Sequence, residues 1–216
     1  GRKEPATVKV IDFNEKTKND YLVVSQLWIQ GQFIRRRPDL IVFVNGLPLI
    51  FIELKNSNIA LRNAYDDNLL NYRKDIPLLF HYNAICILSN GLETKVGSFN
   101  SGYEHFFHWL RAENENQVPD KKRIKQYGVS LDYAVLGLCE KQRLLDYVEN
   151  FILYYNDIAK IAAKNHQFLG VNNAISNFSL RLEHDAAGTD TGNKGKLGVF
   201  WHTQGSGKSY SMIFFA

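Results

Sequence analysis

The sequence predicts an α/β fold in which helices cover a sheet, followed by the start of a second α/β unit. Three observations predict it. Two β-rich apolar runs are joined by Asn45-Gly46, a dipeptide typical of tight hairpins. Residues 60–77 have the apolar spacing of a helix. Residues 196–216 predict an apolar strand, a glycine-rich turn and the start of an apolar helix.

The predicted hairpin, residues 36–56, carries the first candidate site. Asp39 lies about as far before the turn as Glu53 lies after it, so antiparallel pairing sets the two residues opposite each other. Side chains alternate between the faces of a strand, and Glu53 and Lys55 therefore share a face. Two carboxylates and one ammonium thus meet at one end of the sheet. Carboxylate oxygens of this kind suit Mg²⁺ or Mn²⁺.

The same residues have a simpler interpretation, a charge pair at the frayed end of a strand. Both predicted strands are apolar on both faces, as expected of a sheet that is covered on both sides. Burial of Glu53 and Lys55 in such a sheet costs several kcal/mol per ion unless the charges are paired or bind a metal. Spacing alone leaves both interpretations open.

The helix predicted over residues 60–77 ends before Pro77, as helices tend to do. Residues 78–91 then predict a strand that ends in an Asn-Gly turn, with Cys86 in the core. The apolar stripe of the helix consists of Leu61, Tyr65, Leu69 and Tyr72.

The glycine-rich turn is the second candidate site. Its end matches a phosphate-binding loop, in which glycines let backbone N–H groups surround phosphate oxygens. Lys208 would reach the β- and γ-phosphates, and Ser209 would bind Mg²⁺. One position departs from the general pattern, because His202 stands where that pattern has glycine. The expected nucleotide contacts are Thr203, Gly205, Ser206, Gly207, Lys208 and Ser209.

The string RRPDLIVFVNGLPLIFIELKN, residues 36–56, resembles the PD-(D/E)xK nuclease motif. As a whole it resembles the nuclease domain of type I restriction enzyme R subunits. The resemblance implies a restriction-endonuclease-like core, a mixed central sheet flanked by helices. It also implies that Asp39 and Glu53 hold Mg²⁺ or Mn²⁺. Lys55 would position or help deprotonate the attacking water and stabilise the charge that develops on phosphate.

Related nucleases often carry a Gln and a Tyr one turn apart on the next helix, facing the metal. Asn68 and Tyr72 occupy these positions here, so the amide is kept on a shorter side chain. The alternative is an ordinary amphipathic helix with Tyr72 in the core. Some related nucleases use a further Glu upstream of the first strand; Glu4 and Glu15 are present, but neither lies in a helical pattern.

The string WHTQGSGKS, residues 201–209, resembles motif I of the same R subunits and of superfamily 2 translocases. The resemblance implies a RecA-like motor domain that uses ATP. Gln167 stands where a Gln of related motors reads the adenine, although a Gln ahead of a helix also serves as a cap.

These motifs predict two domains, an endonuclease domain over 1–160 and the start of an ATP-dependent translocase domain over 161–216. A long helix over 144–163 is predicted to join them, and 183–198 to form a polar surface loop. Because the chain stops at Ala216, soon after the phosphate loop, we expect a truncated motor that hydrolyses no ATP by itself.

Composition agrees with a polyanionic partner and excludes little. The net charge is +4 and the sequence pI about 8.9. Arg35–Arg37 precede Asp39 and would attract phosphate to the first site, whereas the basic run 121–125 is interpreted as a solvated loop. No apolar run approaches the roughly 20 residues of a membrane span, and no signal peptide is evident. Two cysteines give no disulfide framework, so a cytoplasmic location is expected.

Three functions follow. The first is the metal-dependent nuclease of a type I R subunit, which cleaves double-stranded DNA after ATP-driven translocation. Methyltransferase and specificity subunits would recognise the site for it. The second is an ATP-dependent nuclease-helicase of DNA repair that lacks those partners. The third is a nuclease-like fold kept as a catalytically silent DNA-binding or docking module.

Overall fold

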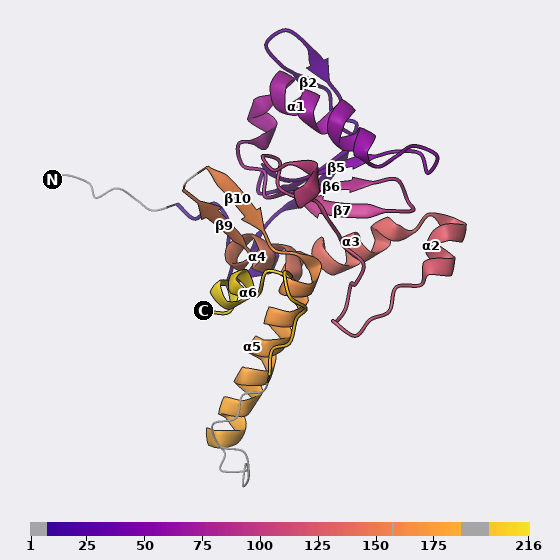
Figure 1. Ribbon diagram of the computed structural model, residues 1–216. Coiled ribbons are helices and arrows are strands. Elements are labelled where there is room, and N and C mark those ends of the chain that lie inside the picture. Colours follow the sequence, from indigo (N-terminus) through magenta and orange to yellow (C-terminus); the bar gives the residue numbers. More distant parts are fainter. Residues whose placement is uncertain (1–7, 157, 187–198) are drawn as a thin grey trace, which may run out of the picture.

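A six-stranded mixed sheet forms the centre of the molecule, in the order β1-β4-β5-β6-β7-β8 (Figure 1). The computed structural model describes residues 8–156, 158–186 and 199–216. Strands β5 and β6 are parallel, and the other neighbouring strands of this sheet are antiparallel. The strands are β1 Tyr21–Ser25, β4 Leu40–Val44, β5 Leu47–Leu54, β6 Ile85–Ser89, β7 Thr94–Gly97 and β8 Phe107–His108.

Two short hairpins lie outside this sheet. Strands β2 and β3 pair beside the end of β4, and β9 and β10 pair between the helices α4 and α5. The first of them extends away from the sheet on the side of α1 (Figure 1). Their bounds are β2 Ile29–Gln30, β3 Arg35–Arg36, β9 Ile152–Tyr155 and β10 Ala159–Ala162.

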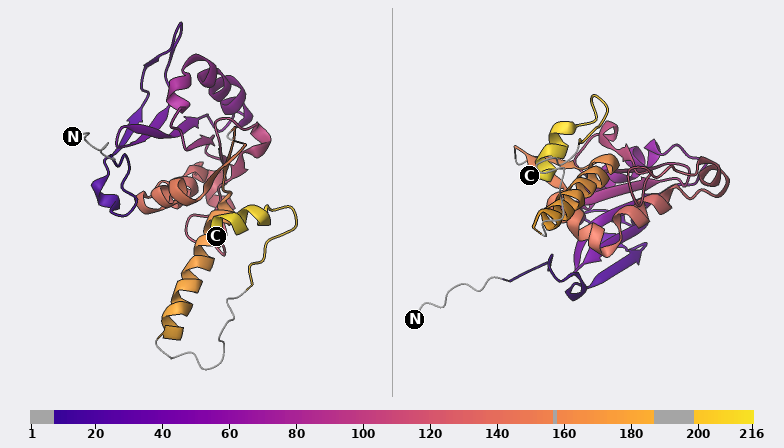
Figure 2. Two further views of the ribbon diagram at one scale, coloured as in Figure 1. Left: turned by 90° about the vertical axis from the view of Figure 1, so that its left-hand side faces the viewer. Right: turned by 90° about the horizontal axis from the view of Figure 1, so that it is seen from below.

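Helices cover both faces of the sheet, with α1 on one side and α3 and α4 on the other (Figures 1 and 2). The long helix α5 projects from the second side, and α6 packs against it. The helices are α1 Leu70–Asp75, α2 Lys121–Tyr127, α3 Ser130–Leu138, α4 Lys141–Asn150, α5 Asn165–Ala186 and α6 Lys208–Phe215. Shorter turns are η1 Lys16–Lys18, the π-helix η2 Ala64–Leu69, η3 Pro77–Phe80 and η4 Tyr103–His105.

The alternation of β5 explains why the sheet has two apolar faces. Phe51 belongs to the cluster under η2 and α1, whereas Ile50 and Ile52 belong to the cluster under α3, α4 and α5. The α/β fold with a mixed central sheet is therefore confirmed. The domain boundary near residue 160 stays a prediction, and the second cluster contains side chains from both sides of it, such as Phe151 and Phe168.

The predicted long helix over 144–163 is wrong. Helix α4 ends at Asn150, and β9 and β10 follow as a hairpin. The run Ile152–Tyr155 is β-branched and aromatic, which favours a strand, and Asn156 has the positive φ of a turn residue. On β10, the ammonium of Lys160 is buried and donates to the carbonyl O of Asn83, which fixes the hairpin against the core.

Three smaller expectations also change. The basic run at 121–125 lies on helix α2 rather than in a loop, because Asp120 caps it by accepting from Arg123 N at 2.9 Å. The strand expected over 78–91 is restricted to β6, since Pro77 begins the turn η3. Helix α5 reaches Ala186, so residues 183–186 of the predicted loop are helical. The rest of that prediction, residues 187–198, lies outside the described part of the chain, as does Glu4.

Across the described residues, no helix combines the length and the apolar character needed to cross a membrane.

Candidate active site

The β4–β5 hairpin sets the first two candidate residues opposite each other. Asn45 and Gly46 both have positive φ, as the tight turn requires. A β-bulge between Val42 and Phe43 then shifts the register by one residue, so that Leu40 pairs with Ile52. Continued by one residue, this register sets Asp39 opposite Glu53. Without the bulge, Asp39 would face the other side of the sheet from Glu53.

Asp39 is held by the backbone of the opposite strand. Its Oδ2 accepts a hydrogen bond from Leu54 N at 2.8 Å, and Gln26 N donates to its carbonyl O at 2.8 Å. Its side chain lines a hollow at the end of β5 together with Lys55 and Asn56. The carboxylate is therefore fixed in position yet open to solvent.

Glu53 is almost completely buried, with 2 % of its surface exposed. Its Oε1 lies 3.8 Å from Lys55 Nζ, while its Oε2 is buried and has no hydrogen-bond partner among the described residues. Burial and, to a smaller extent, the charge of Asp39 raise the pKa of Glu53 to about 8 against the opposing effect of Lys55. A buried carboxylate with an unpaired oxygen is costly, so Glu53 has a strong tendency to bind a proton or a cation.

Tyr72 on α1 lies near these carboxylates, and Asn68 on η2 contacts Tyr72. Asn68 Nδ2 donates to Tyr72 Oη at 3.4 Å, and that hydroxyl lies 3.4 Å from the carbonyl O of Arg37. The Tyr72 ring packs edge-on against Phe51, with the ring centres 5.8 Å apart. Burial raises the pKa of Tyr72, and the charges of Glu53 and Asp39 add to that effect. Tyr72 is thus both a core residue and a neighbour of the carboxylates, and its catalytic role stays a prediction.

The π-helical segment η2 sets the positions of these two residues. It widens the first turns of the helix between Ala64 and Leu69, and π-segments are frequent at functional sites. The predicted helix is thereby confirmed in place, although its first turns are not α-helical.

The three arginines before Asp39 do not act alike. Arg36 is half-buried, donates from Nε to Asp75 Oδ2 at 2.7 Å and lies over the ring of Tyr72. Arg35 and Arg37 are exposed, and Arg37 lies over the ring of Trp28. Two of the three charges therefore remain available for a phosphate.

The ligand set suits a hard divalent cation and is small. No group of three or more His, Cys, Asp and Glu side chains that could hold a metal occurs among the described residues. Asp39 and Glu53 form a pair of carboxylates, and the unpaired Oε2 of Glu53 is a free ligand atom. Mg²⁺ is commonly bound by one or two carboxylates with water and substrate oxygens, so the residues present fit it.

The second candidate site has the backbone of a tight loop before a helix. Gly205 and Gly207 have φ of 77° and 88°, and α6 begins at Lys208. Lys208 Nζ donates to the carbonyl O atoms of His202 at 2.7 Å and Thr203 at 3.2 Å. The ammonium thus occupies the loop that its sequence predicts for phosphate. Ser209 is exposed on the first turn of α6.

The apolar strand expected before this loop is not observed in the residues that the structure describes there. Residues 199–201 form no strand, and residues 196–198 lie outside the described part of the chain. The strand–loop–helix of a motor domain therefore stays a prediction.

Gln167 is buried and bonded to the loop rather than free for a base. Its Nε2 donates to the carbonyl O of Gly207 at 2.9 Å, and its Oε1 accepts from Lys164 N at 2.8 Å. His166 Nε2 lies 3.0 Å from the carbonyl O of Ser206, whose Oγ is buried without a partner among the described residues. Contact with adenine stays a prediction, since both polar ends of Gln167 are engaged.

Sequence reasoning missed two residues that support this loop. His166 is one of them, and its position beside Gln167 was the available signal. The other is Glu115, whose Oε1 lies 3.3 Å from His202 Nε2 although 87 positions separate the residues. No local pattern could have found that contact.

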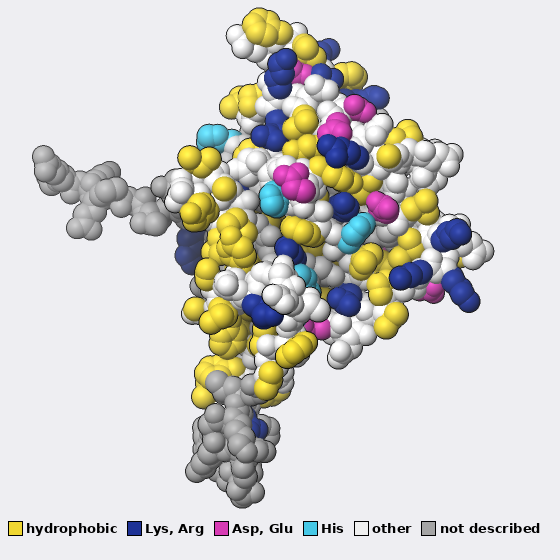
Figure 3. Space-filling model, viewed as in Figure 1, with side chains coloured by type: hydrophobic (Ala, Val, Ile, Leu, Met, Phe, Trp, Pro, Cys, Tyr) yellow, Lys and Arg dark blue, Asp and Glu magenta, His cyan; other side chains and the backbone are white. Residues whose placement is uncertain are grey.

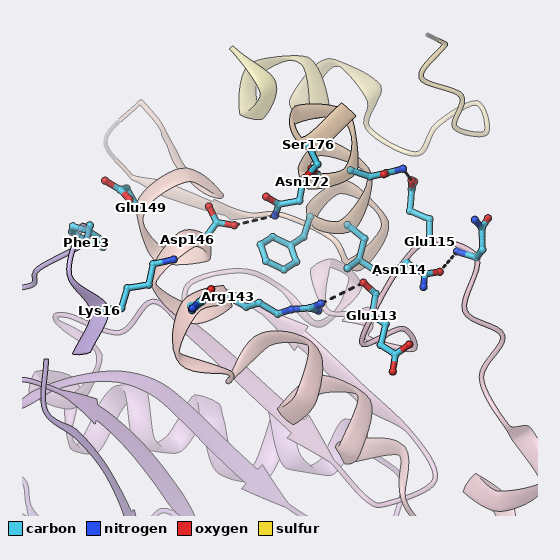
Figure 4. A pocket seen from close by; sticks show the side chains of 15 residues that line it. Phe13, Lys16, Glu113, Asn114, Glu115, Arg143, Asp146, Glu149, Asn172 and Ser176 are labelled. Atoms are coloured by element: carbon cyan, nitrogen blue, oxygen red, sulfur yellow. Dashed lines mark hydrogen bonds between the residues drawn. The ribbon is translucent and has the colours of Figure 1, made fainter. Parts of the chain in front are cut away.

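A second pocket, of about 560 Å³, lies between α4, α5 and residues 113–116 and contains none of the predicted site residues (Figure 4). Its polar side chains bind one another: Asp146 accepts from Asn172 at 2.9 Å, and Arg143 donates to the carbonyl O of Glu113 at 3.3 Å. The pocket is therefore a polar junction between elements, and it adds nothing to the carboxylate site.

Comparison with known proteins agrees with this geometry. Residues 1–105 match the family model described as type I restriction enzyme R protein N terminus, and residues 166–216 match that of the SWI2/SNF2 ATPase. The mixed central sheet between helices fits a restriction-endonuclease-like core.

Several relatives match the whole of this chain, including the following two. The type I restriction enzyme HindI endonuclease subunit of Haemophilus influenzae is 36 % identical, and the match covers 100 % of this chain and 20 % of that protein. A Methanocaldococcus jannaschii protein, provisionally named as the MjaIXP type I restriction endonuclease subunit, is also 36 % identical, over 100 % of this chain and 22 % of that protein. The chain therefore belongs to the type I restriction enzyme R proteins, and it spans about a fifth of the length of these relatives.

Proposed function

We propose that this chain is the metal-dependent endonuclease domain of a type I restriction enzyme R subunit and hydrolyses phosphodiester bonds of double-stranded DNA. The observation that carries the proposal is the buried Glu53 carboxylate, opposite Asp39 and 3.8 Å from Lys55 Nζ, with one oxygen unpaired. A purely structural ion pair would satisfy both carboxylate oxygens, because an unpaired buried oxygen costs stability.

Each residue has a distinct role. Asp39 and Glu53 would hold Mg²⁺ or Mn²⁺, which when bound acts as a Lewis acid on the phosphate and on water. Lys55 orients the attacking water and offsets the negative charge that develops on the phosphate. Tyr72, with Asn68 on its hydroxyl, contributes a hydrogen-bond donor beside the carboxylates.

The phosphate loop would serve the same enzyme in another way. In the full-length subunit we propose that it binds ATP with Mg²⁺, through Lys208 and Ser209, and that translocation delivers DNA to the nuclease. The matching relatives are named as endonuclease subunits, which supports an assembly with other subunits. We propose that these are methyltransferase and specificity subunits. A repair nuclease-helicase without such partners would cleave DNA regardless of its methylation.

The test is Lys55→Ala in the full-length subunit, assembled with its partner subunits on unmethylated DNA. Loss of the ammonium should reduce the cleavage rate at least about 100-fold and leave ATP hydrolysis within twofold of wild type. Lys122→Ala, an exposed lysine on α2, is the matched control. Unchanged cleavage by Lys55→Ala would move the active centre elsewhere and favour a silent binding module.

A further inference from the structure

The β2–β3 hairpin and its flanking residues, 27–37, form an arm that leads directly into the carboxylate site. Ile29 pairs with Arg36, and Gly31 N donates to the carbonyl O of Ile34 at 3.0 Å, which closes the turn. The chain reaches Asp39 two residues after the arm ends. The arm projects from the molecule beside α1 (Figure 1).

The inner side of this arm is fixed to the body of the protein. Leu27 and Ile29 pack on the apolar cluster under α1, and Arg36 pairs with Asp75 at the end of that helix. At Gly31 the backbone lies so close to the carbonyl O of Asp75 that a Cβ atom would overlap it. The arm is therefore a built part of the fold.

The outer side of the arm packs against no other element in the described part of the chain. Because side chains alternate along a strand, residues flanking the inward Ile29 and Arg36 point outward together. Trp28 is 60 % exposed and carries the Arg37 guanidinium over its ring at 5.0 Å. The outward residues are Trp28, Gln30, Arg35 and Arg37, which are all exposed.

The tip is apolar and the whole arm lacks acid. Phe33 is 85 % exposed and Ile34 47 %. The sequence LWIQGQFIRRR, residues 27–37, contains three arginines and no Asp or Glu. Figure 3 shows Lys and Arg side chains around an apolar tip at this end of the molecule. Arg36 is paired with Asp75, whereas Arg35 and Arg37 have no carboxylate partner among the described residues. Two such cations beside exposed apolar side chains favour a polyanionic ligand that also offers apolar surface.

We propose that the outer face of this arm binds the DNA duplex next to the bond that the carboxylate site cleaves. This inference rests on the proposed nuclease function. A two-stranded β-ribbon has the dimensions of the major groove, and arginine binds phosphate oxygens in pairs of hydrogen bonds. Arg35 and Arg37 contact the backbone, and Phe33 enters the groove at the tip.

Position supports DNA over a protein partner. The arm continues into the hollow lined by Gln26, Asp39 and Lys55, where a phosphodiester must lie for hydrolysis. The arm ends only two residues before Asp39, so a duplex bound at the hollow also runs beside the arm. The arm thus holds the strand in register with the carboxylates, as backbone contacts do without reading sequence.

The first experiment compares Arg35→Ala/Arg37→Ala with Lys121→Ala/Lys122→Ala in the full-length subunit with its partners. Both pairs are exposed and remove the same charge, but the second lies on α2. On a plasmid that the wild type cleaves, the arm variant should cleave at least about tenfold more slowly, recover at low salt and keep its ATP hydrolysis. Equal cleavage by the two variants would overturn the proposal.

The second experiment is independent of cleavage. A photocrosslinking amino acid replaces Phe33, or Lys122 as control, in the Lys55→Ala subunit with labelled linear plasmid and ATP. Crosslinks to DNA from position 33 above those from position 122 support the arm. Crosslinks from position 33 only to a partner subunit, or to nothing, overturn it. Crosslinking in the Lys55→Ala subunit does not depend on cleavage. A negative crosslinking result therefore contradicts the proposed role of the arm without bearing on the proposed nuclease.

Discussion

The carboxylate site and the phosphate loop differ in whether their charged side chain already has hydrogen-bond partners. At the carboxylate site, Glu53 is buried with one oxygen unpaired. At the phosphate loop, Lys208 donates to two loop carbonyls and Gln167 to a third. The charged group of the first cluster therefore keeps an unpaired oxygen until something binds, whereas the cation of the second already has partners that a ligand must displace. Ligands should therefore stabilise the first site strongly and rearrange the second.

The sharpest way to separate the two clusters is Lys208→Ala, set against Lys55→Ala, in the full-length subunit. Lys208→Ala should abolish ATP hydrolysis, at least about 100-fold, because it removes the cation proposed for the β- and γ-phosphates. DNA cleavage should fall with it, since translocation delivers the DNA.

The same substitution should change the stability of the fold very little. The ammonium of Lys208 is exposed, so its two bonds to carbonyls contribute at most about 1 kcal/mol to the free energy of unfolding. Steady-state ATP hydrolysis and thermal unfolding check both statements. Retained ATP hydrolysis by Lys208→Ala would contradict the proposed nucleotide site.

The second prediction concerns pH and tests whether burial of the charged Glu53 carboxylate destabilises the fold. The pKa of this carboxyl is raised from 4.5 to about 8, so the folded chain binds the proton more tightly than the unfolded chain does. Stability is therefore highest at low pH with respect to this group, and it falls as pH rises from about 4.5 to about 8. Glu53→Gln carries no such charge and should gain up to a few kcal/mol over wild type at pH 8 but little at pH 5.

Urea denaturation in EDTA at the two pH values measures this difference, with the exposed Glu149→Gln as control. Added Mn²⁺ should stabilise the wild type at pH 8, by about 2.7 kcal/mol at 100 times its dissociation constant, and should have little effect on Glu53→Gln. An equal Gln effect at both pH values would show that Glu53 is not strained.

Much of the carboxylate site could be predicted because it depends on local rules. Asn45-Gly46 determines the turn, and alternation places Glu53 and Lys55 on one face. The pairing of Asp39 with Glu53 could be predicted only approximately. Asp39 and Glu53 differ by one residue in their distance from the turn, and only the bulge after Val42 sets them opposite each other. A bulge depends on packing against neighbouring strands, which leaves no local signal.

The phosphate loop shows a different limit. Sequence correctly indicated a glycine turn followed by a helix at Lys208. It could not indicate that Gln167 bonds to Gly207, because that contact spans 40 positions. The helix predicted over 144–163 failed for a similar reason: the fit of Lys160 against Asn83 stabilises a hairpin that the local spacing does not reveal. The strands of the arm, β2 and β3, have two residues each, which is too short for an alternation of polar and apolar side chains to predict them from the sequence.

The smallest expected effect decides between the two interpretations of Tyr72, core residue or catalytic neighbour. Tyr72→Phe keeps the ring that packs on Phe51 and removes only the hydroxyl, whose two polar contacts are both long at 3.4 Å. The free energy of unfolding should change by less than about 1 kcal/mol. If the hydroxyl acts beside Asp39 and Glu53, the cleavage rate should nevertheless fall by about tenfold with ATP hydrolysis unchanged. Tyr65→Phe, on the same helix but bonded to the carbonyl O of Ser101, is the matched control and should cleave normally. Equal cleavage rates for the two variants would assign Tyr72 to the core alone and restrict the catalytic set to Asp39, Glu53 and Lys55.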